Sequence, residues 1–152
     1  MIKLYYNPIS TYSLRILIAA AEKGIELELV KIDFATRQHK NEEFLRLNPY
    51  GRVPAIQDGD FVLYESSSIL HYLDEKYPEN PLLPRDIQQK SLANLHMRLC
   101  DLEFSNQAFI ILKQIAFLPK EQWNLKQMQS AKEAIEKHLE ILAETVDSKE
   151  YI

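Results

Sequence analysis

The sequence predicts an α/β domain followed by an all-helical region. Up to residue 78, short apolar runs typical of strands alternate with helical stretches in the order βαβαββα. A proline-rich connector follows over residues 79–85, and the three prolines between Pro78 and Pro84 exclude a helix there. Beyond it only helical periodicities occur. We therefore expect an α/β domain over residues 1–78 and an all-α domain over residues 86–152.

The first three elements predict a parallel pair of strands. Strands are expected at Lys3–Tyr6 and Leu27–Asp33. Between them Ser13–Lys23 is apolar almost all round, which predicts a helix buried against a sheet, and Gly24 is a C-cap signal. A strand–helix–strand order implies parallel strands joined by a right-handed crossover.

The remaining elements of the first domain predict a mixed four-stranded sheet. A short helix is expected at Asn41–Leu47. An Asp-Gly pair between Ala55–Asp58 and Phe61–Tyr64 predicts a β-hairpin. A further helix is expected at Glu65–Tyr77, where apolar residues share one face.

Two long amphipathic helices are expected in the second region. Apolar residues spaced three and four apart predict one helix from Asp86 to about Phe117. The same spacing predicts a second helix between Met128 and Val146.

Composition and charge argue against several classes of partner. The net charge is −4 and the pI is about 5.6, whereas nucleic-acid binders usually carry a basic face. No apolar run approaches the ~18 residues that cross a membrane, and no secretory signal is visible. The single cysteine fits a reducing compartment, and no His or Cys has a partner at metal-ligand spacing. We expect a cytoplasmic protein with no metal, no membrane and no direct nucleic-acid partner.

The residues before the third expected strand carry chemical information. Val53-Pro54 immediately precedes that strand, and proline cannot donate to a sheet ladder. This order predicts a tight turn with either a cis or an ordinary trans peptide. A cis turn would leave the backbone of Val53 facing outward, free to pair with another extended backbone.

Glu65-Ser66 lies where the fourth strand gives way to a helix. Ser66 is expected to be the helix N-cap. The first-turn amides and the positive end of the helix dipole also attract an anion. A carboxylate at Glu65 would hold an amino group, so the pair predicts a zwitterion site; the alternative is that Ser66 only caps its helix.

In combination these segments resemble the cytosolic glutathione transferases. The resemblance covers the first domain, about half of the chain. It implies a thioredoxin-like N-terminal domain, an all-helical C-terminal domain, a cis peptide at Pro54, glutathione as co-substrate and a homodimer. The segments that carry it are Leu4–Ser10, Glu22–Ile25, Asn48–Pro54 and Tyr64–Leu73.

The resemblance assigns binding roles residue by residue. It implies that Val53, beside Pro54, pairs through its backbone with the cysteinyl part of glutathione. It also implies that Glu65 and Ser66 hold the γ-glutamyl end, in agreement with the predicted zwitterion site.

The outer parts of the implied site are assigned in the same way. His39 aligns with a histidine that contacts the glycyl end, and Lys40 is close enough to pair with a carboxylate. The alternative is that both lie solvated on a surface loop. The small electrophile is expected near Asn106 and Phe109, between the first domain and the long helix.

A hydroxyl just after the first strand is expected to activate the thiol. A free thiol has a pKa of about 8.5, and one hydrogen bond to the thiolate, worth roughly 1.5–3 kcal/mol, lowers it by one or two units. Ser10 aligns with the catalytic serine of Ser-type members and is the expected residue. The alternatives are Tyr6, which occupies the place of the catalytic tyrosine, Ser13, which is also a plausible N-cap, and no competent residue.

The chain also resembles the stringent starvation protein A group. The shared segments are Tyr12-Ser13, Glu22–Gly24, Leu47–Tyr50 and Leu63–Ser66, together with the connector. That group keeps the transferase fold and binds RNA polymerase without transferase activity, so the resemblance implies a non-catalytic alternative. The loop from Thr36 to Leu45 is longer and more like the transferases.

The length is short for a transferase. The resemblance implies that the all-α domain is incomplete, because family members continue past Lys149–Ile152 into a capping box and a buried helix. The two long helices would then expose apolar stripes. We expect either a truncated product, whose activity in detoxification is open, or a chain that compensates by tight self-association.

Overall fold

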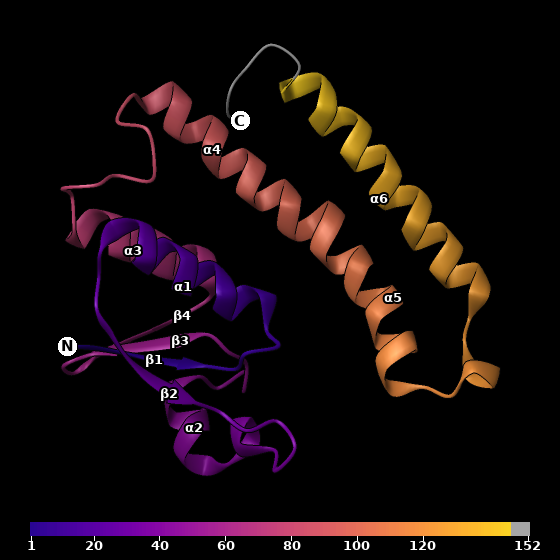
Figure 1. Ribbon diagram of the computed structural model, residues 1–152, viewed down its shortest axis with the longest axis horizontal. Coiled ribbons are helices and arrows are strands. Elements are labelled where there is room, and N and C mark those ends of the chain that lie inside the picture. The colour runs from indigo at the N-terminus through magenta and orange to yellow at the C-terminus, as the bar shows by residue number, and fades with distance from the viewer. Residues whose placement is uncertain (147–152) are drawn as a thin grey trace. The chain divides into compact units, whose positions relative to one another are not determined.

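The computed structural model describes residues 1–146 and divides into two compact units, one up to Leu83 and one from Pro84 onward. The order βαβαββα followed by helices alone confirms the predicted fold class (Figure 1). In the first unit the elements are β1 (Ile2–Tyr6), α1 (Thr11–Lys23), β2 (Leu27–Lys31), the 3₁₀ turn η1 (Gln38–Lys40), α2 (Glu42–Leu47), β3 (Ala55–Asp58), β4 (Phe61–Tyr64) and α3 (Ser66–Lys76).

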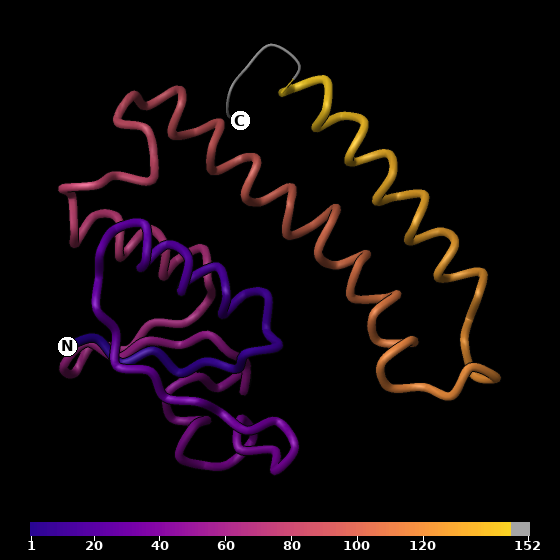
Figure 2. The backbone as a smooth tube through the Cα atoms, in the orientation of Figure 1, coloured from indigo at the N-terminus to yellow at the C-terminus, as the bar shows by residue number. Residues whose placement is uncertain are grey.

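The second unit is a helical hairpin. Its elements are α4 (Ile87–Leu99), a π-helical segment η2 (Cys100–Ser105), α5 (Asn106–Phe117), a 3₁₀ turn η3 (Lys120–Gln122) and α6 (Leu125–Val146). Figure 2 shows the chain passing from α4 through η2 into α5 as one uninterrupted rod. The expected helix from Asp86 to Phe117 is therefore continuous, with a π-helical turn that spacing of apolar residues does not reveal. The carboxylate of Asp86 caps it by accepting from two first-turn amides.

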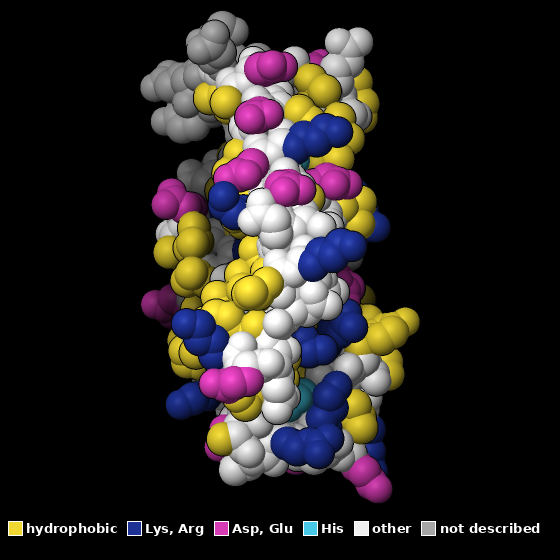
Figure 3. Space-filling model, turned by 90° about the vertical axis from the view of Figure 1, so that its right-hand side faces the viewer, with side chains coloured by type: hydrophobic (Ala, Val, Ile, Leu, Met, Phe, Trp, Pro, Cys, Tyr) yellow, Lys and Arg dark blue, Asp and Glu magenta, His cyan; other side chains and the backbone are white. Residues whose placement is uncertain are grey.

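The helices of the second unit carry many exposed apolar side chains. Figure 3 shows apolar side chains flanking a band of polar and charged ones on one face of the molecule. No helix in residues 1–146 is long and apolar enough to cross a membrane. Lys149–Ile152, where the chain was expected to stop short of its relatives, lie outside the described residues. The exposed apolar residues of this unit include Ile87, Leu92, Leu95, Leu102, Phe109, Leu112, Ile115, Phe117, Leu125, Leu139 and Ile141.

The strands form a mixed sheet of order β2-β1-β3-β4. β1 and β2 are parallel, whereas β3 is antiparallel to both β1 and β4. This arrangement confirms the predicted parallel pair and hairpin. In the register, Tyr5 lies opposite Ala55, which in turn lies opposite Tyr64.

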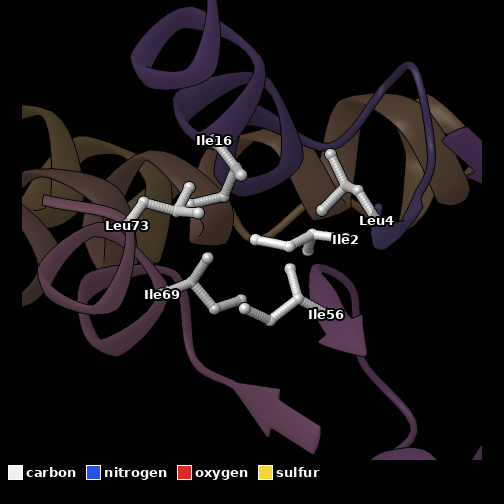
Figure 4. Packing of buried hydrophobic residues seen from close by; sticks show 6 residues of the cluster. All are labelled: Ile2, Leu4, Ile16, Ile56, Ile69 and Leu73. Carbon is white, nitrogen blue, oxygen red and sulfur yellow. The ribbon is translucent and has the colours of Figure 1, made fainter. Parts of the chain in front are cut away.

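Two apolar clusters lie on opposite faces of the sheet, because successive strand residues point to opposite sides. In Figure 4, Ile16 from α1 and Leu73 from α3 lie beside each other next to Ile2, and Ile69 from α3 meets Ile56. The second cluster lies under α2 and joins its Phe44 to Val53. Helix α1 packs against the sheet as expected, but its apolar Leu14 and Ile18 are about half exposed, so not all of its apolar surface is covered.

A buried ion pair joins α1, α3 and the connector. The Nζ atom of Lys23 lies 2.7 Å from a carboxylate oxygen of Asp74 and donates to the carbonyl of Asn80 at 2.6 Å. Asp74 also accepts the N–H groups of Leu82 and Leu83 at 2.7 and 3.2 Å. Burial raises the pKa of the Asp74 carboxyl, but the hydrogen bonds from Leu82, Lys23 and Leu83 outweigh it and hold that pKa below its usual range.

Candidate ligand-binding site

The register of the sheet gathers most of the expected site residues at one end of the first unit. The turn after β1, the Val53-Pro54 peptide before β3 and the Glu65-Ser66 pair after β4 adjoin the paired residues Tyr5, Ala55 and Tyr64. Because β2 is parallel to β1, the loop that carries η1 leaves from the same end. Four separate segments thus approach one another where their strands end.

The peptide between Val53 and Pro54 is cis, which confirms the expectation for this turn. Val53 is 8% exposed and its side chain belongs to the second apolar cluster. Its side chain is therefore committed to the core and is not available for contacts outside it.

Ser10, not Ser13, caps helix α1. Its Oγ accepts the N–H of Ser13 at 3.2 Å, and its backbone is extended, as an N-cap requires. Ser13 is fully buried in the first turn, where its Oγ accepts the N–H of Asn7 at 3.4 Å, so the alternative in which Ser13 is the N-cap does not hold. Tyr6 lies in β1 and packs against the first apolar cluster. Of these three side chains, Ser10 lies at the open end of a helix.

The capping bond leaves Ser10 with a proton to donate. A hydroxyl has one donor and two acceptor lone pairs, so accepting from Ser13 leaves the O–H available. The N-terminus of α1 also favours negative charge, and a thiolate is stabilised at such a helix end.

Helix α3 begins without a serine cap. Glu65 has φ 70° and ψ 117°, a conformation that costs a non-glycine residue on the order of 1–3 kcal/mol and often marks a binding site. Ser66 is already inside the first turn, and its Oγ accepts from Nη1 of Arg15 at 3.2 Å. The expectation that Ser66 is the N-cap is therefore wrong, because the turn at Glu65 starts the helix one residue earlier.

Arg15 brings a positive charge to the start of α3. Arg15 lies in α1. Its guanidinium lies 5.2 Å from the centre of the Tyr12 ring and donates a hydrogen bond to the hydroxyl of Ser66 in α3. Arg15 is not among the site residues expected from the sequence, since the contact with Ser66 spans 51 residues. The guanidinium and the α3 amides together make this end of the sheet favourable for an anion.

His39 and Lys40 in η1 both make contacts with the chain, His39 half-buried and Lys40 exposed. The His39 ring packs edge-on against Phe34 at 4.8 Å, and its buried Nδ1 has no hydrogen-bond partner in the described chain. Burial lowers the pKa of His39, and the charges of Lys40 and Arg37 lower it further. Lys40 donates from Nζ to the carbonyl of Tyr50 at 3.0 Å.

Asn7 holds the turn that ends at Ser10. Its Oδ1 accepts the N–H of Ile9 at 3.0 Å, its carbonyl accepts the N–H of Ser10 at 3.0 Å, and its Nδ2 donates to the carbonyl of Ile32 at 2.8 Å. Pro8, between Asn7 and Ile9, has the fixed φ that suits a turn. Asn7 is not among the site residues expected from the sequence.

Asn48 builds the same turn in the loop before the cis peptide. Its Oδ1 accepts the N–H of Tyr50 at 3.0 Å, its carbonyl accepts the N–H of Gly51 at 2.8 Å, and its Nδ2 donates to the carbonyl of Arg52 at 2.7 Å. Proline again follows the asparagine, at Pro49. The recurring Asn-Pro dipeptide is the sequence signal that could have identified both turns.

The remaining expected residues lie in the second unit. Asn106 and Phe109 are one turn apart on α5 and both are exposed, Phe109 to 59%. Within residues 1–146, no group of three or more His, Cys, Asp or Glu side chains is placed to hold a metal ion.

Comparisons of sequence and of structure both match the chain to glutathione transferases. The family described as "Glutathione S-transferase, N-terminal domain" matches residues 1–75. Over 90 residues the chain is 43% identical to glutathione S-transferase 1 of Dianthus caryophyllus, covering 59% of this chain and 41% of that protein. A solved structure of glutathione S-transferase-I bound with lactoylglutathione is 30% identical, with a TM-score of 0.83, and the match covers 99% of this chain and 73% of that one.

A relative with a different name also matches. The stringent starvation protein A homolog of Coxiella burnetii is 33% identical over 148 residues, covering 97% of this chain and 65% of that protein. The matches to the first curated relatives span only about two fifths of the length of those proteins.

Proposed function

The chain belongs to the glutathione transferase family, and from that premise we propose that it binds glutathione and activates its thiol for addition to small electrophiles. One observation supports this most strongly. The sheet register brings the Ser10 turn, the cis Val53-Pro54 peptide and the Glu65-Ser66 pair to the same end of the first unit.

Each part of a γ-glutamyl tripeptide has a chemical counterpart among these residues. The backbone of Val53 would pair with the cysteinyl backbone, since its side chain is buried. The Glu65 carboxylate would hold the α-amino group, while Ser66, Arg15 and the α3 amides would hold the α-carboxylate.

The glycyl end would lie toward η1. Lys40 supplies a cation there, exposed in η1 beside His39.

Ser10 would donate its hydroxyl proton to the thiolate. A hydrogen bond to a charged group is worth roughly 1.5–3 kcal/mol, which favours the thiolate by one or two pKa units. Tyr6 and Ser13 are less suitable, because the Tyr6 ring packs on the core and Ser13 is fully buried.

The wider parts of the proposal follow from the family. The electrophile would lie near Asn106 and Phe109, the protein would act as a cytoplasmic homodimer, and its role would be detoxification. These assignments are drawn from whole transferases, and this chain matches only part of the length of those relatives.

The test is glutathione binding by calorimetry together with a conjugation assay on Ser10→Ala. We expect binding to persist and the conjugation rate at neutral pH to fall by roughly 10- to 100-fold, the value of one charged hydrogen bond. The matched control is Thr11→Ala, which removes the neighbouring exposed hydroxyl. An unchanged rate and pH profile in Ser10→Ala would reject Ser10 as the activating residue.

The match to the Coxiella burnetii protein, which covers 97% of this chain and 65% of that protein, favours one second candidate, a non-catalytic scaffold that binds RNA polymerase. It predicts measurable affinity for purified RNA polymerase and no glutathione binding. Glutathione binding without polymerase binding would reject it.

A further inference from the structure

The turn that carries Ser10 is fixed by one buried side chain, and we infer that Asn7 is a positioning residue for the thiol-activating hydroxyl. This inference rests on the proposed function, because the hydroxyl that it positions is the one assigned to the thiolate.

Asn7 holds the turn at each of its polar atoms. Only 6% of the residue is exposed. Its Oδ1 and its carbonyl bind the N–H groups of Ile9 and Ser10, both at 3.0 Å. Its own N–H points to the hydroxyl of Ser13 at 3.4 Å. Asn7 alone therefore fixes the backbone on both sides of the turn.

The side-chain amide of Asn7 also ties the turn to the sheet. Nδ2 donates to the carbonyl of Ile32 at 2.8 Å, and the N–H of Ile32 donates to the carbonyl of Tyr6 at 2.7 Å. The turn is thereby anchored to the residue that follows β2 as well as to β1. Without this bond the Ile32 carbonyl would lose its partner, and the turn would be held by β1 alone.

The hydroxyl is thus constrained from two directions. Asn7 fixes the backbone of Ser10, and the N–H of Ser13 fixes the direction of the Ser10 Oγ by donating the capping bond to it. A thiolate hydrogen bond needs its donor within a few tenths of an ångström of the right place. Loosening the turn should therefore weaken thiol activation even when glutathione still binds.

Asn48 separates this role from a general contribution to stability. It is 1% exposed and makes the same three kinds of hydrogen bond in a turn that leads to Val53 instead of Ser10. Losing either side chain removes equivalent bonds. Only the loss of Asn7 should change the pKa of the bound thiol, whereas the loss of Asn48 should act on glutathione affinity.

The experiment compares Asn7→Ala and Asn7→Ser with Asn48→Ala. The pKa of the bound glutathione thiol is followed by the ultraviolet absorbance of the thiolate, and kcat and KM are measured in parallel. We expect the Asn7 variants to raise the thiol pKa by about one unit and to lower kcat about tenfold at neutral pH with little change in KM. Asn48→Ala should raise KM and leave the thiol pKa at the wild-type value.

Asn7→Ser covers the case in which Asn7→Ala does not fold, because serine keeps an acceptor for the turn but cannot reach Ile32. An unchanged thiol pKa in a folded Asn7 variant, while Ser10→Ala shifts it, would overturn the inference alone. An equal shift in Asn48→Ala would also overturn it. Wild-type protein that does not bind glutathione would instead overturn the proposed function, and the positioning role with it.

Discussion

The turns at Asn7 and Asn48 share one hydrogen-bonded frame but present different groups. The fourth residue of the first turn is Ser10, whose extended backbone starts a helix and whose hydroxyl is the group presented. The fourth residue of the second turn is Gly51, which is buried at φ 59° and leads to the backbone of Val53. In the proposed function, the same scaffold would serve side-chain chemistry at one position and backbone recognition at the other.

The difference between the turns also lies in crowding. A Cβ atom at Gly51 would lie 2.6 Å from the carbonyl oxygen of His39 and 2.7 Å from Nζ of Lys40. Ser10, in contrast, is only half-buried. The second turn thus depends on the absence of a side chain, and the first depends on the presence of one.

Gly51→Ala should produce the largest effect. A positive φ costs an alanine roughly 1–2 kcal/mol and overpacking adds roughly 1–3 kcal/mol, so the free energy of unfolding should fall by about 3 kcal/mol. Glutathione affinity should fall as well, because His39 and Lys40 would be displaced. Urea unfolding and calorimetry measure the two effects.

Gly59→Ala is the matched control for that change. Gly59 has a similar φ of 61° but nothing within 4 Å of its missing Cβ, so only the backbone cost of roughly 1–2 kcal/mol is expected. Equal losses in the two variants would show that crowding at Gly51 is unimportant.

Substitutions at Ser10 should separate capping from chemistry. Ser10→Ala should lose about 1 kcal/mol of stability, whereas Ser10→Asp should keep it, since aspartate is as good an N-cap as serine. Both variants should lose thiol activation, because neither donates a proton at neutral pH and aspartate repels a thiolate. Thermal melts and conjugation rates check this, and an active Ser10→Asp would contradict the proposed chemistry.

Replacing each proline of the two turns should test whether the frames are equivalent. Pro8→Ala and Pro49→Ala should each cost about 0.4–1 kcal/mol, mainly by giving the unfolded chain more freedom. Similar changes in the urea midpoint would support a common frame. A loss confined to one variant would show that one turn depends more strongly on its proline.

The smallest effect should be a pH dependence near the second turn. Because burial and neighbouring cations lower the pKa of His39, the folded state binds this proton less readily than the unfolded chain does. The contribution of His39 to the free energy of unfolding is complete above pH 6.5, the pKa of histidine in the unfolded chain. It is lost as the pH falls through the lower pKa of His39 in the folded state. His39→Gln should flatten the decline in unfolding free energy between neutral and mildly acidic pH, and an unchanged slope would contradict this.

Much of the fold could be predicted because its signals are local. Gly24 takes φ 67° and donates its N–H to two carbonyls of α1, as a C-cap glycine does. The Asp-Gly pair at residues 58–59 marks the hairpin. The error concerns the start of α3, where Ser66 was expected to be the N-cap but Glu65 holds that position, because the choice depends on backbone angles that composition does not encode.

The candidate site was predictable where a motif is contiguous and not where it depends on distant contacts. Val53-Pro54 and Glu65-Ser66 are recognisable as dipeptides. The bond from Asn7 to the carbonyl of Ile32 joins residues 25 positions apart. Such pairing follows from the sheet register, which the sequence determines only through the whole fold.

The buried pair of Lys23 and Asp74 decides where the first unit can be separated from the rest of the chain. A fragment ending at Pro78, the expected boundary, would remove the Asn80 carbonyl that Lys23 binds and the connector N–H groups that Asp74 accepts. It would leave two interior charges with only each other as partners, whereas a fragment extended to Leu83 keeps the whole set. The partners of the Lys23–Asp74 pair therefore extend five residues past Pro78 into the connector, and the first compact unit ends with them at Leu83.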